Sequence, residues 1–431
     1  MILGEESKNY YFYFMRFFIL EHYINPKSQI STYFYPIENA QSITIGWYIR
    51  CGSRNDSIEK RGISYLLERF LYSSAPHNEF EKIGGIFDAI TDKDYTRFSL
   101  KFHPKYLHNA LNCFFDFILK TDWNQEKFNI QKDLQLRKIE RSDMRYDKML
   151  GSLLWNDHSL SYPVIGTKKT VLKLRLDDLI SHKKRYYTQK NVAFFAAGNF
   201  DENEIVLMNE FLSNAEFPCG VKESFQAPKI GERKPDIKFL NYADNELKVA
   251  LYFDLNFNVV NRDCVTLLNS ILGEGELSCL SSCCYKSKCM YNAYSFVSTH
   301  IDSAVLCINY HVKAHDFWMS LNMIVEQIER IKKCKEESLA YNKPFFMDNM
   351  WFWLEDTRQF NDYLAWNTYF CGSENFTIKQ KIESFKNISC DELNKTANTI
   401  FRFCNTSVLI CGQTNKIDKT ELNDFLHNNL K

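Results

Sequence analysis

Tyr65, Glu68 and Arg69 are the residues whose types and spacing point most directly to chemistry. The apolar positions 63, 66, 67, 70 and 71 predict a helix with one buried face, and positions 65, 68 and 69 lie together on such a helix. Residues one turn apart hold a catalytic metal when they are imidazoles, and a glutamate between them then acts as the base. Arginine stays protonated and cannot donate a lone pair. Taken alone, Tyr-x-x-Glu-Arg therefore does not identify any particular kind of site, and Glu68 would be a solvated helix residue.

The segments that surround this helix follow one another in a recognisable order. They are GWYIRCGSRNDSIEKRGISYLLERFLYSSA from Gly46, GGIFDAITDKDYT from Gly84, WNDHSLSYPVIG from Trp155 and NVAFFAAGNFD from Asn191. In this order they resemble the pitrilysin/insulinase-type zinc peptidases (inverzincins), whose helix carries His-x-x-Glu-His. Tyr65 and Arg69 stand where that family has its two histidines, so the chain is identified as a degenerate member.

The resemblance also implies a third ligand position. The family takes a Glu ligand from a later long helix, and aligning residues 128–139 on that helix puts Lys138 at the ligand and Gln131 at a supporting carboxylate. Zinc uses imidazoles and carboxylates, and two cations would repel it. We therefore expect no metal, no cofactor and no catalytic residue at these degenerate zinc-site positions. We expect Glu68 to form an ion pair with Arg69 or Lys138.

In the family, the second half contributes an Arg–Tyr pair that holds the peptide backbone. Residues 272–302 resemble that region, but two alignments are open. One places Ser287 and Tyr291 on the pair, and the other places Lys288 and Asn292 there. Neither supplies an arginine. Lys286 or Lys288 beside Tyr291 could still hold a carboxylate or carbonyl, less rigidly than arginine would, and Lys288 with Tyr291 is the candidate substrate-binding pair. Ordinary exposed side chains are the alternative.

Cysteine is abundant, with 14 residues in the chain. Cys279, Cys283, Cys284 and Cys289 lie close together, but their spacing matches no familiar zinc or iron–sulfur pattern. We expect these thiols to be packing residues that stay reduced.

The chain reads as two related halves. NVAFFAAG from Asn191 and NTSVLICG from Asn405 are strand-like runs, and each follows a helical stretch that opens at Asp178 or Glu392. Strands are predicted at 42–51, 96–102 and 247–255, and helices at 107–119, 128–149 and 317–331, the last as the counterpart of 128–149. Pro and Gly mark a linker at 219–236 between an N-terminal domain, 1–218, and a C-terminal domain, 237–431. The fold class is α+β, and the resemblance implies two homologous α/β-roll domains, each a mostly antiparallel sheet packed against helices.

Charge and composition narrow the classes of partner. Lys and Arg number 53, as do Asp and Glu, so the zero net charge gives no reason to expect nucleic acid or an anionic membrane. No run of 18 or more uncharged apolar residues predicts a membrane span. The first residues, MILGEESKNYYFYFMRFFIL, lack the features of a signal peptide, which favours the cytoplasm.

Short members of the family are half-chambers that dimerise, often with one catalytic and one non-catalytic chain. The resemblance therefore implies a non-catalytic subunit of a heterodimeric zinc peptidase. Its partner would be a homologue with an intact His-x-x-Glu-His, and its substrate a peptide such as a ribosomal peptide or bacteriocin precursor. A stand-alone peptide-binding or scaffold protein without proteolysis is the main alternative, and an enzyme with a relocated active site is another.

Overall fold

The protein forms two compact units, each built around one sheet. The computed structural model describes residues 20–225, 227–228, 236–243, 246–287, 289–373 and 377–431. The first unit contains residues up to Ser142, Tyr162–Ser224 and Trp351–Lys381, and the second contains Asp143–Ser161, Phe225–Met350 and Ile382–Lys431. The N-terminal segment 1–19, Lys288 and parts of the predicted linker (226 and 229–235) lie outside the described residues.

The first unit carries a six-stranded sheet. Its order is β1-β2-β6-β3-β5-β4, with β2 and β6 parallel and the other neighbours antiparallel. Its elements are β1 (Glu21–Ile24), β2 (Ser31–Pro36), β3 (Ile43–Ile49), α2 (Ile63–Ser74), α3 (His77–Lys82), β4 (Ile86–Thr91), β5 (Thr96–Phe102), α4 (Leu107–Leu119), α5 (Gln125–Arg141), α7 (Lys168–Val171), α8 (Leu176–Tyr186), β6 (Val192–Gly198), α9 (Glu202–Ser213) and α14 (Thr357–Ala365).

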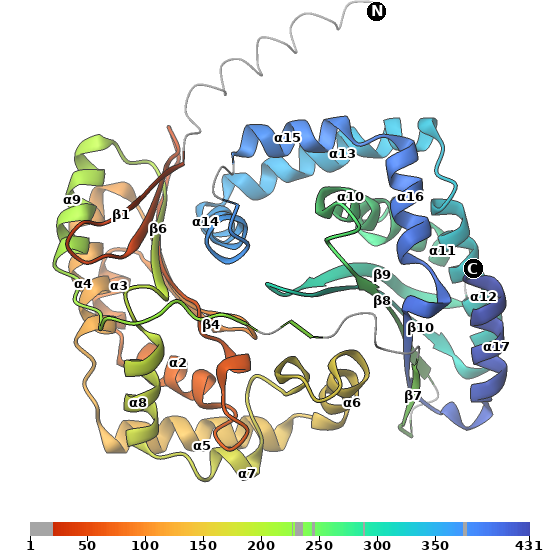
Figure 1. The fold of residues 1–431 in the computed structure, drawn as a ribbon, viewed down its shortest axis with the longest axis horizontal. Helices are drawn as coiled ribbons and strands as arrows, with labels where there is room; N and C mark the ends of the chain where they lie inside the picture. The colour runs from red at the N-terminus through yellow and green to blue at the C-terminus, as the bar shows by residue number, and fades with distance from the viewer. Residues whose placement is uncertain (1–19, 226, 229–235, 244–245, 288, 374–376) are drawn as a thin grey trace, which may run out of the picture. The chain divides into compact units, whose positions relative to one another are not determined.

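Successive side chains along each strand point to opposite faces of this sheet. Ile43, Ile45, Trp47 and Ile49 of β3 point into the main apolar core. Helices including α4 and α9 complete this core on one face of the sheet (Figure 1). The intervening β3 residues belong to the other face, where α14 packs.

The second unit repeats the strand order in a five-stranded sheet. Its order is β7-β11-β8-β10-β9, with only β7 and β11 parallel among these neighbours. Its elements are α6 (Met144–Trp155), β7 (Asp236–Asn241), β8 (Glu246–Leu255), α10 (Arg262–Gly273), α11 (Cys279–Ser287), β9 (Met290–Thr299), β10 (Ala304–Lys313), α12 (Phe317–Ile331), α16 (Cys390–Ile400), β11 (Thr406–Gly412) and α17 (Lys419–Asn429). The boundary between the two units falls inside two further helices, α13 (Glu336–Glu355) and α15 (Ile378–Asn387). The predicted α+β fold with two homologous, mostly antiparallel domains is confirmed.

Each sheet receives one helix from the other half of the sequence. α14 packs on β3, β5 and β6 of the first sheet, and Thr357 Oγ1 lies 2.8 Å from Thr44 Oγ1. α6 packs on β7 and β11 of the second sheet, with Leu153 and Leu154 in a separate apolar core. Residues 143–161 therefore belong to the second unit and residues 351–381 to the first. In this the compact units differ from the predicted contiguous domains, 1–218 and 237–431.

Two predicted features of the helices are wrong. The continuous helix at 128–149 is two helices, α5 and α6, separated at Ser142 and Asp143, where Asp143 accepts a hydrogen bond from Arg145 N and starts α6. The helix at 317–331 has the predicted bounds, but it follows β10 as α4 follows β5, so its counterpart is α4. No described helix is both long and apolar enough to span a membrane.

Candidate functional site

The start of α2 is fixed by backbone geometry and by buried hydrogen bonds. Gly62 precedes the helix with a φ of 93°, and a Cβ there would lie 2.8 Å from Gln135 Nε2. Asp56 accepts hydrogen bonds from Gly62 N at 2.8 Å and from Ser64 Oγ at 2.6 Å. Gln135 Nε2 donates to Gly62 O at 3.0 Å, which holds α5 against α2. Lys138, one turn after Gln135, is thereby placed beside α2.

Glu68 and Arg69 form the predicted ion pair. Arg69 donates from Nε to Glu68 Oε2 at 2.9 Å and from Nη2 to Oε1. The Glu68 side chain is 1% exposed and that of Arg69 is 30% exposed. Burial raises the pKa of the Glu68 carboxyl, and the hydrogen bond and charge of Arg69 oppose that rise. Partial burial alone would lower the pKa of Arg69, but the bond to Glu68 raises it.

Lys138 lies at the same place from the other side. Its Nζ donates to Tyr65 Oη at 3.1 Å and sits 4.9 Å from the centre of the Tyr65 ring. The structure thus brings together all four predicted positions, although Lys138 is 73 residues from Tyr65 in sequence. Gln131, which lies two turns before Lys138 on α5, is half-buried.

These residues do not fit a zinc ion. Tyr65, Arg69 and Lys138 present a phenol and two cations, and both oxygens of Glu68 already accept from Arg69. Over the part of the chain that the structure describes, no three His, Cys, Asp or Glu side chains are grouped to hold a metal. The cluster can bind by hydrogen bonding and charge, and it has no arrangement for activating water on a metal.

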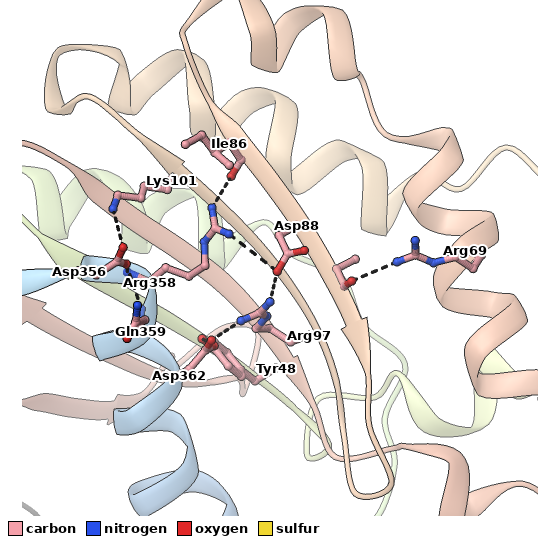
Figure 2. A network of polar contacts seen from close by, with 11 residues as sticks. Tyr48, Arg69, Ile86, Asp88, Arg97, Lys101, Asp356, Arg358, Gln359 and Asp362 are labelled. Atoms are coloured by element: carbon pink, nitrogen blue, oxygen red, sulfur yellow. Dashed lines mark hydrogen bonds and ion pairs between the residues drawn. The ribbon is translucent and has the colours of Figure 1, made fainter. Parts of the chain in front are cut away.

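The edge of the first sheet meets this cluster at Ala89. β4 is an edge strand, and Asp92 N donates to Tyr95 O at 2.8 Å to close its hairpin with β5. Because antiparallel pairs alternate, the Ala89 carbonyl faces the unpaired edge. Arg69 Nη2 donates to that carbonyl at 3.0 Å. Figure 2 draws this bond from the labelled Arg69 side chain.

An ionic network holds α14 against the second face of this sheet (Figure 2). Arg97 of β5 pairs with both Asp88 of β4 and Asp362 of α14, and Tyr48 Oη donates to Asp362 Oδ1 at 2.6 Å. Burial raises the pKa of the Asp362 carboxyl, and the charge of Arg97 opposes the rise. Lys101 pairs with Asp356 at 3.2 Å. The network ties the edge hairpin to a helix from the other half of the sequence.

A buried cluster beside α2 was missed by the sequence reasoning. Ser64 Oγ lies 3.0 Å from His182 Nε2, and Cys51 Sγ lies 3.6 Å from the same nitrogen. Burial lowers the pKa of His182 to about 3 and raises that of Asp56 to about 7. Cys51 is fully buried, so the cluster supports the start of α2 and offers no nucleophile to a substrate. No local signal reveals it, because His182 is 118 residues from Ser64.

The predicted pair in the second half is described only in part. Lys288 lies outside the described residues. Tyr291 stands on β9, is 39% exposed, and donates from its hydroxyl to Glu246 of β8. Its ring centre lies 5.4 Å from that of His311 on β10.

The cysteine cluster contains free thiols. Cys279, Cys283, Cys284 and Cys289 carry free thiols. Cys283 is buried on α11, and Cys289 Sγ contacts Met323 Sδ at 3.8 Å. Burial raises the pKa of Cys283 to about 11, so its thiol stays protonated. This agrees with packing as the role predicted for these residues.

Comparison with known proteins identifies relatives along most of the chain. A zinc protease of Rickettsia felis, named as uncharacterized, is 26% identical over 407 residues, which cover 89% of this chain and 96% of the relative. YmxG of Bacillus subtilis, named in the same way, is 24% identical over 382 residues, with 84% and 91% covered.

The fold has matches among solved structures as well. A structure described as a peptidase M16 inactive domain from Pseudomonas fluorescens aligns with a TM-score of 0.82 at 16% identity. The alignment covers 91% of this chain and 98% of that one.

Two family models match consecutive parts of the sequence. The model described as Insulinase (Peptidase family M16) matches residues 36–168, which include the whole Tyr65–Lys138 cluster. The model described as Peptidase M16 inactive domain matches residues 173–343. With the duplicated fold and the relatives that span it, these matches show that the chain belongs to the insulinase family of peptidases, M16.

Proposed function

We propose that this chain is the non-catalytic subunit of a heterodimeric zinc peptidase. It completes the peptide-binding chamber of a catalytic homologue that carries an intact His-x-x-Glu-His. The substrate is a peptide, with a ribosomal peptide or bacteriocin precursor as the example suggested by the sequence. We further propose that the chain works in the cytoplasm, a compartment that would keep its 14 cysteines reduced.

The observation that carries the proposal is the occupation of the metal-site positions by fixed charge. Arg69 uses both oxygens of Glu68, the one carboxylate that the family resemblance would keep as a base. Lys138 and Tyr65 hydrogen-bond to one another. A residue set of this kind neither binds zinc nor activates water. The names of the relatives describe those proteins, which share about a quarter of their residues with this chain.

The outer edge of β4, against which no strand of the described residues pairs, supports a peptide-binding role. An edge strand accepts an extended peptide through its free backbone groups. Ile86 and Ile90 of β4 are 56% and 42% exposed and would contact alternate side chains of an added strand. We also propose that Lys288 and Tyr291 contact the peptide, and exposure of the Tyr291 ring supports this.

Mixing the full chain with an M16 homologue of similar length that keeps His-x-x-Glu-His tests the proposal. Size-exclusion chromatography with light scattering would report assembly, and mass spectrometry of a peptide mixture would report cleavage. We expect a one-to-one complex whose peptidase activity exceeds that of either chain alone. A partner whose motif glutamate is replaced by glutamine is the matched control, and it should assemble without cleaving.

Two results would contradict the proposal. One is failure of every such homologue from the same source to associate. The other is activity that stays with the isolated chain. Peptide binding by the isolated chain without any assembly would favour the alternative, a stand-alone peptide-binding protein.

A further inference from the structure

The degenerate metal site has more hydrogen-bond donors than acceptors. Glu68 supplies its only carboxylate, and both of its oxygens accept from Arg69. The remaining members, Tyr65 and Lys138, bond to each other through the Lys138 ammonium and the Tyr65 oxygen. Because that oxygen accepts, the Tyr65 hydroxyl proton remains available to an outside acceptor.

The site also carries one uncompensated positive charge. Glu68 neutralises Arg69, while no Asp or Glu among the described residues lies within ion-pair distance of Lys138. Nearby acids are occupied elsewhere, since Glu140 of α5 pairs with Lys168 at 2.6 Å and Asp88 pairs with Arg97. The charge on Lys138 is therefore left for a ligand.

Both cations can be reached from solvent. Lys138 is exposed, and the Arg69 side chain is 30% exposed. Arg69 uses Nε and Nη2 in its bonds to Glu68 and Ala89, and its Nη1 has no acceptor in the described part of the chain. The Tyr72 ring, 4.8 Å from the Arg69 guanidinium, helps to fix the guanidinium plane. A ligand thus meets N–H groups that are already oriented.

We propose that Lys138, Tyr65 and Arg69 form a binding site for a carboxylate of the peptide. This inference adds a binding site to the proposed function. It rests on that function because it assumes that a peptide enters the chamber. The carboxylate is either the C-terminus of the peptide or an Asp or Glu side chain. An acceptor-only anion matches a donor-rich site, and charge-assisted hydrogen bonds are among the stronger polar contacts. A peptide along the β4 edge would pass Ala89, whose carbonyl is held by Arg69 of the same site.

Three peptides of alternating threonine and valine, each labelled at its N-terminus with an uncharged fluorophore, would test this on the isolated full chain. The first ends in a free carboxylate, the second in an amide, and the third in an amide but with one central glutamate. Fluorescence anisotropy should show the first or the third binding about tenfold more tightly than the second, the value of one charge-assisted hydrogen bond. Whichever of the two is preferred identifies the source of the carboxylate.

Variants on α5 separate this site from general positive charge. Lys138→Gln should abolish the preference for a carboxylate, and Lys138→Arg should retain it. Arg137→Gln is the matched control, because it removes one exposed positive charge from the adjacent position and should leave the preference unchanged. Equal binding of all three peptides, or binding of none at millimolar concentration, would overturn the proposal. Persistence of the preference in Lys138→Gln would do so too.

Assembly with a catalytic homologue separates this inference from the proposed function. Lys138→Gln should form the complex as the native chain does. If the native chain forms no complex, the proposed function fails while the peptide measurements still decide the carboxylate site.

Discussion

Helices α2 and α10 occupy equivalent places in the two units but differ in the chemistry they bury. Helix α2 follows β3 and packs against the edge strand β4 and against α8. Helix α10 follows β8 and packs against the edge strand β9 and against α16. Their runs of buried positions coincide when Glu68 is aligned with Asn269. At that position α2 has a carboxylate and α10 a neutral amide, 1% and 2% exposed.

The difference shows that the shared fold does not require a charge at this position. Asn269 donates to Glu274 Oε1 at 2.5 Å, and a serine, Ser270, stands where α2 has Arg69. Glu68, in contrast, depends on Arg69 for both of its oxygens. A buried ion pair contributes little net stability over neutral residues. We therefore attribute the pair in α2 to the site rather than to packing.

Removing the cation from α2 should have the largest effect on stability. Arg69→Ala leaves the carboxylate of Glu68 buried without a partner, which should lower the free energy of unfolding by about 3 kcal/mol. Urea unfolding followed by circular dichroism would measure it. Ser270→Ala, at the equivalent position of α10, is the matched control and should cost less than about 0.5 kcal/mol. Equal losses at the two positions would refute the distinction between the helices.

Acid should weaken the contact between α2 and α8 and leave the corresponding contact between α10 and α16 unchanged. His182 of α8 has a folded pKa of about 3 against an ordinary value of 6.5, so the unfolded chain binds more protons between those values. Its contribution to stability is complete above pH 6.5 and declines as the pH falls towards 3. Relative to His182→Gln, the native chain should lose about 2 kcal/mol between pH 7 and pH 5.

The comparison with this variant isolates the histidine. Asp56, whose pKa burial raises to about 7, titrates in both proteins, so its effect largely cancels. The residue equivalent to His182, at the same distance from the matched leucines Leu179 and Leu393, is Thr396. Thr396→Val should therefore leave the pH dependence unchanged. Parallel stability curves for the native chain and His182→Gln would show that the imidazole titrates normally.

Transferring the α10 residues to α2 should have the smallest effect. The double variant Glu68→Asn with Arg69→Ser removes both charges together, so no buried ion is left alone. We expect a loss of about 1 kcal/mol, clearly smaller than that of Arg69→Ala. The same urea titration measures it. A double variant as unstable as the single one would mean that α2 needs its ion pair for packing.

Local sequence patterns predicted much of the fold. The apolar spacing around Tyr65 placed α2, and strand-like runs placed β3, β5 and β8. The family alignment put Lys138 at the third ligand position, and in the structure Lys138 Nζ lies 3.1 Å from Tyr65 Oη. These predictions succeeded because periodicity and motif order are properties of short segments.

Features that depend on tertiary packing were not predicted. Ser142 and Asp143 interrupt a pattern that reads as one helix, and the capping role of Asp143 went unrecognised. The apolar face of α14 does not reveal which sheet it will cover. Likewise, His182 and Ser64 meet only after the chain has folded. Nothing in sequence spacing encodes such contacts.

The zinc content of the purified chain tests the central claim most directly. The full chain would be equilibrated with zinc, dialysed and measured by inductively coupled plasma mass spectrometry, beside a homologue that keeps His-x-x-Glu-His. Because we assign the ligand positions to Tyr65, Arg69 and Lys138, which cannot coordinate zinc, we predict zinc far below one ion per chain, with one ion per chain in the homologue. One tightly held zinc per chain, lost on substitution of Glu68, would contradict the account.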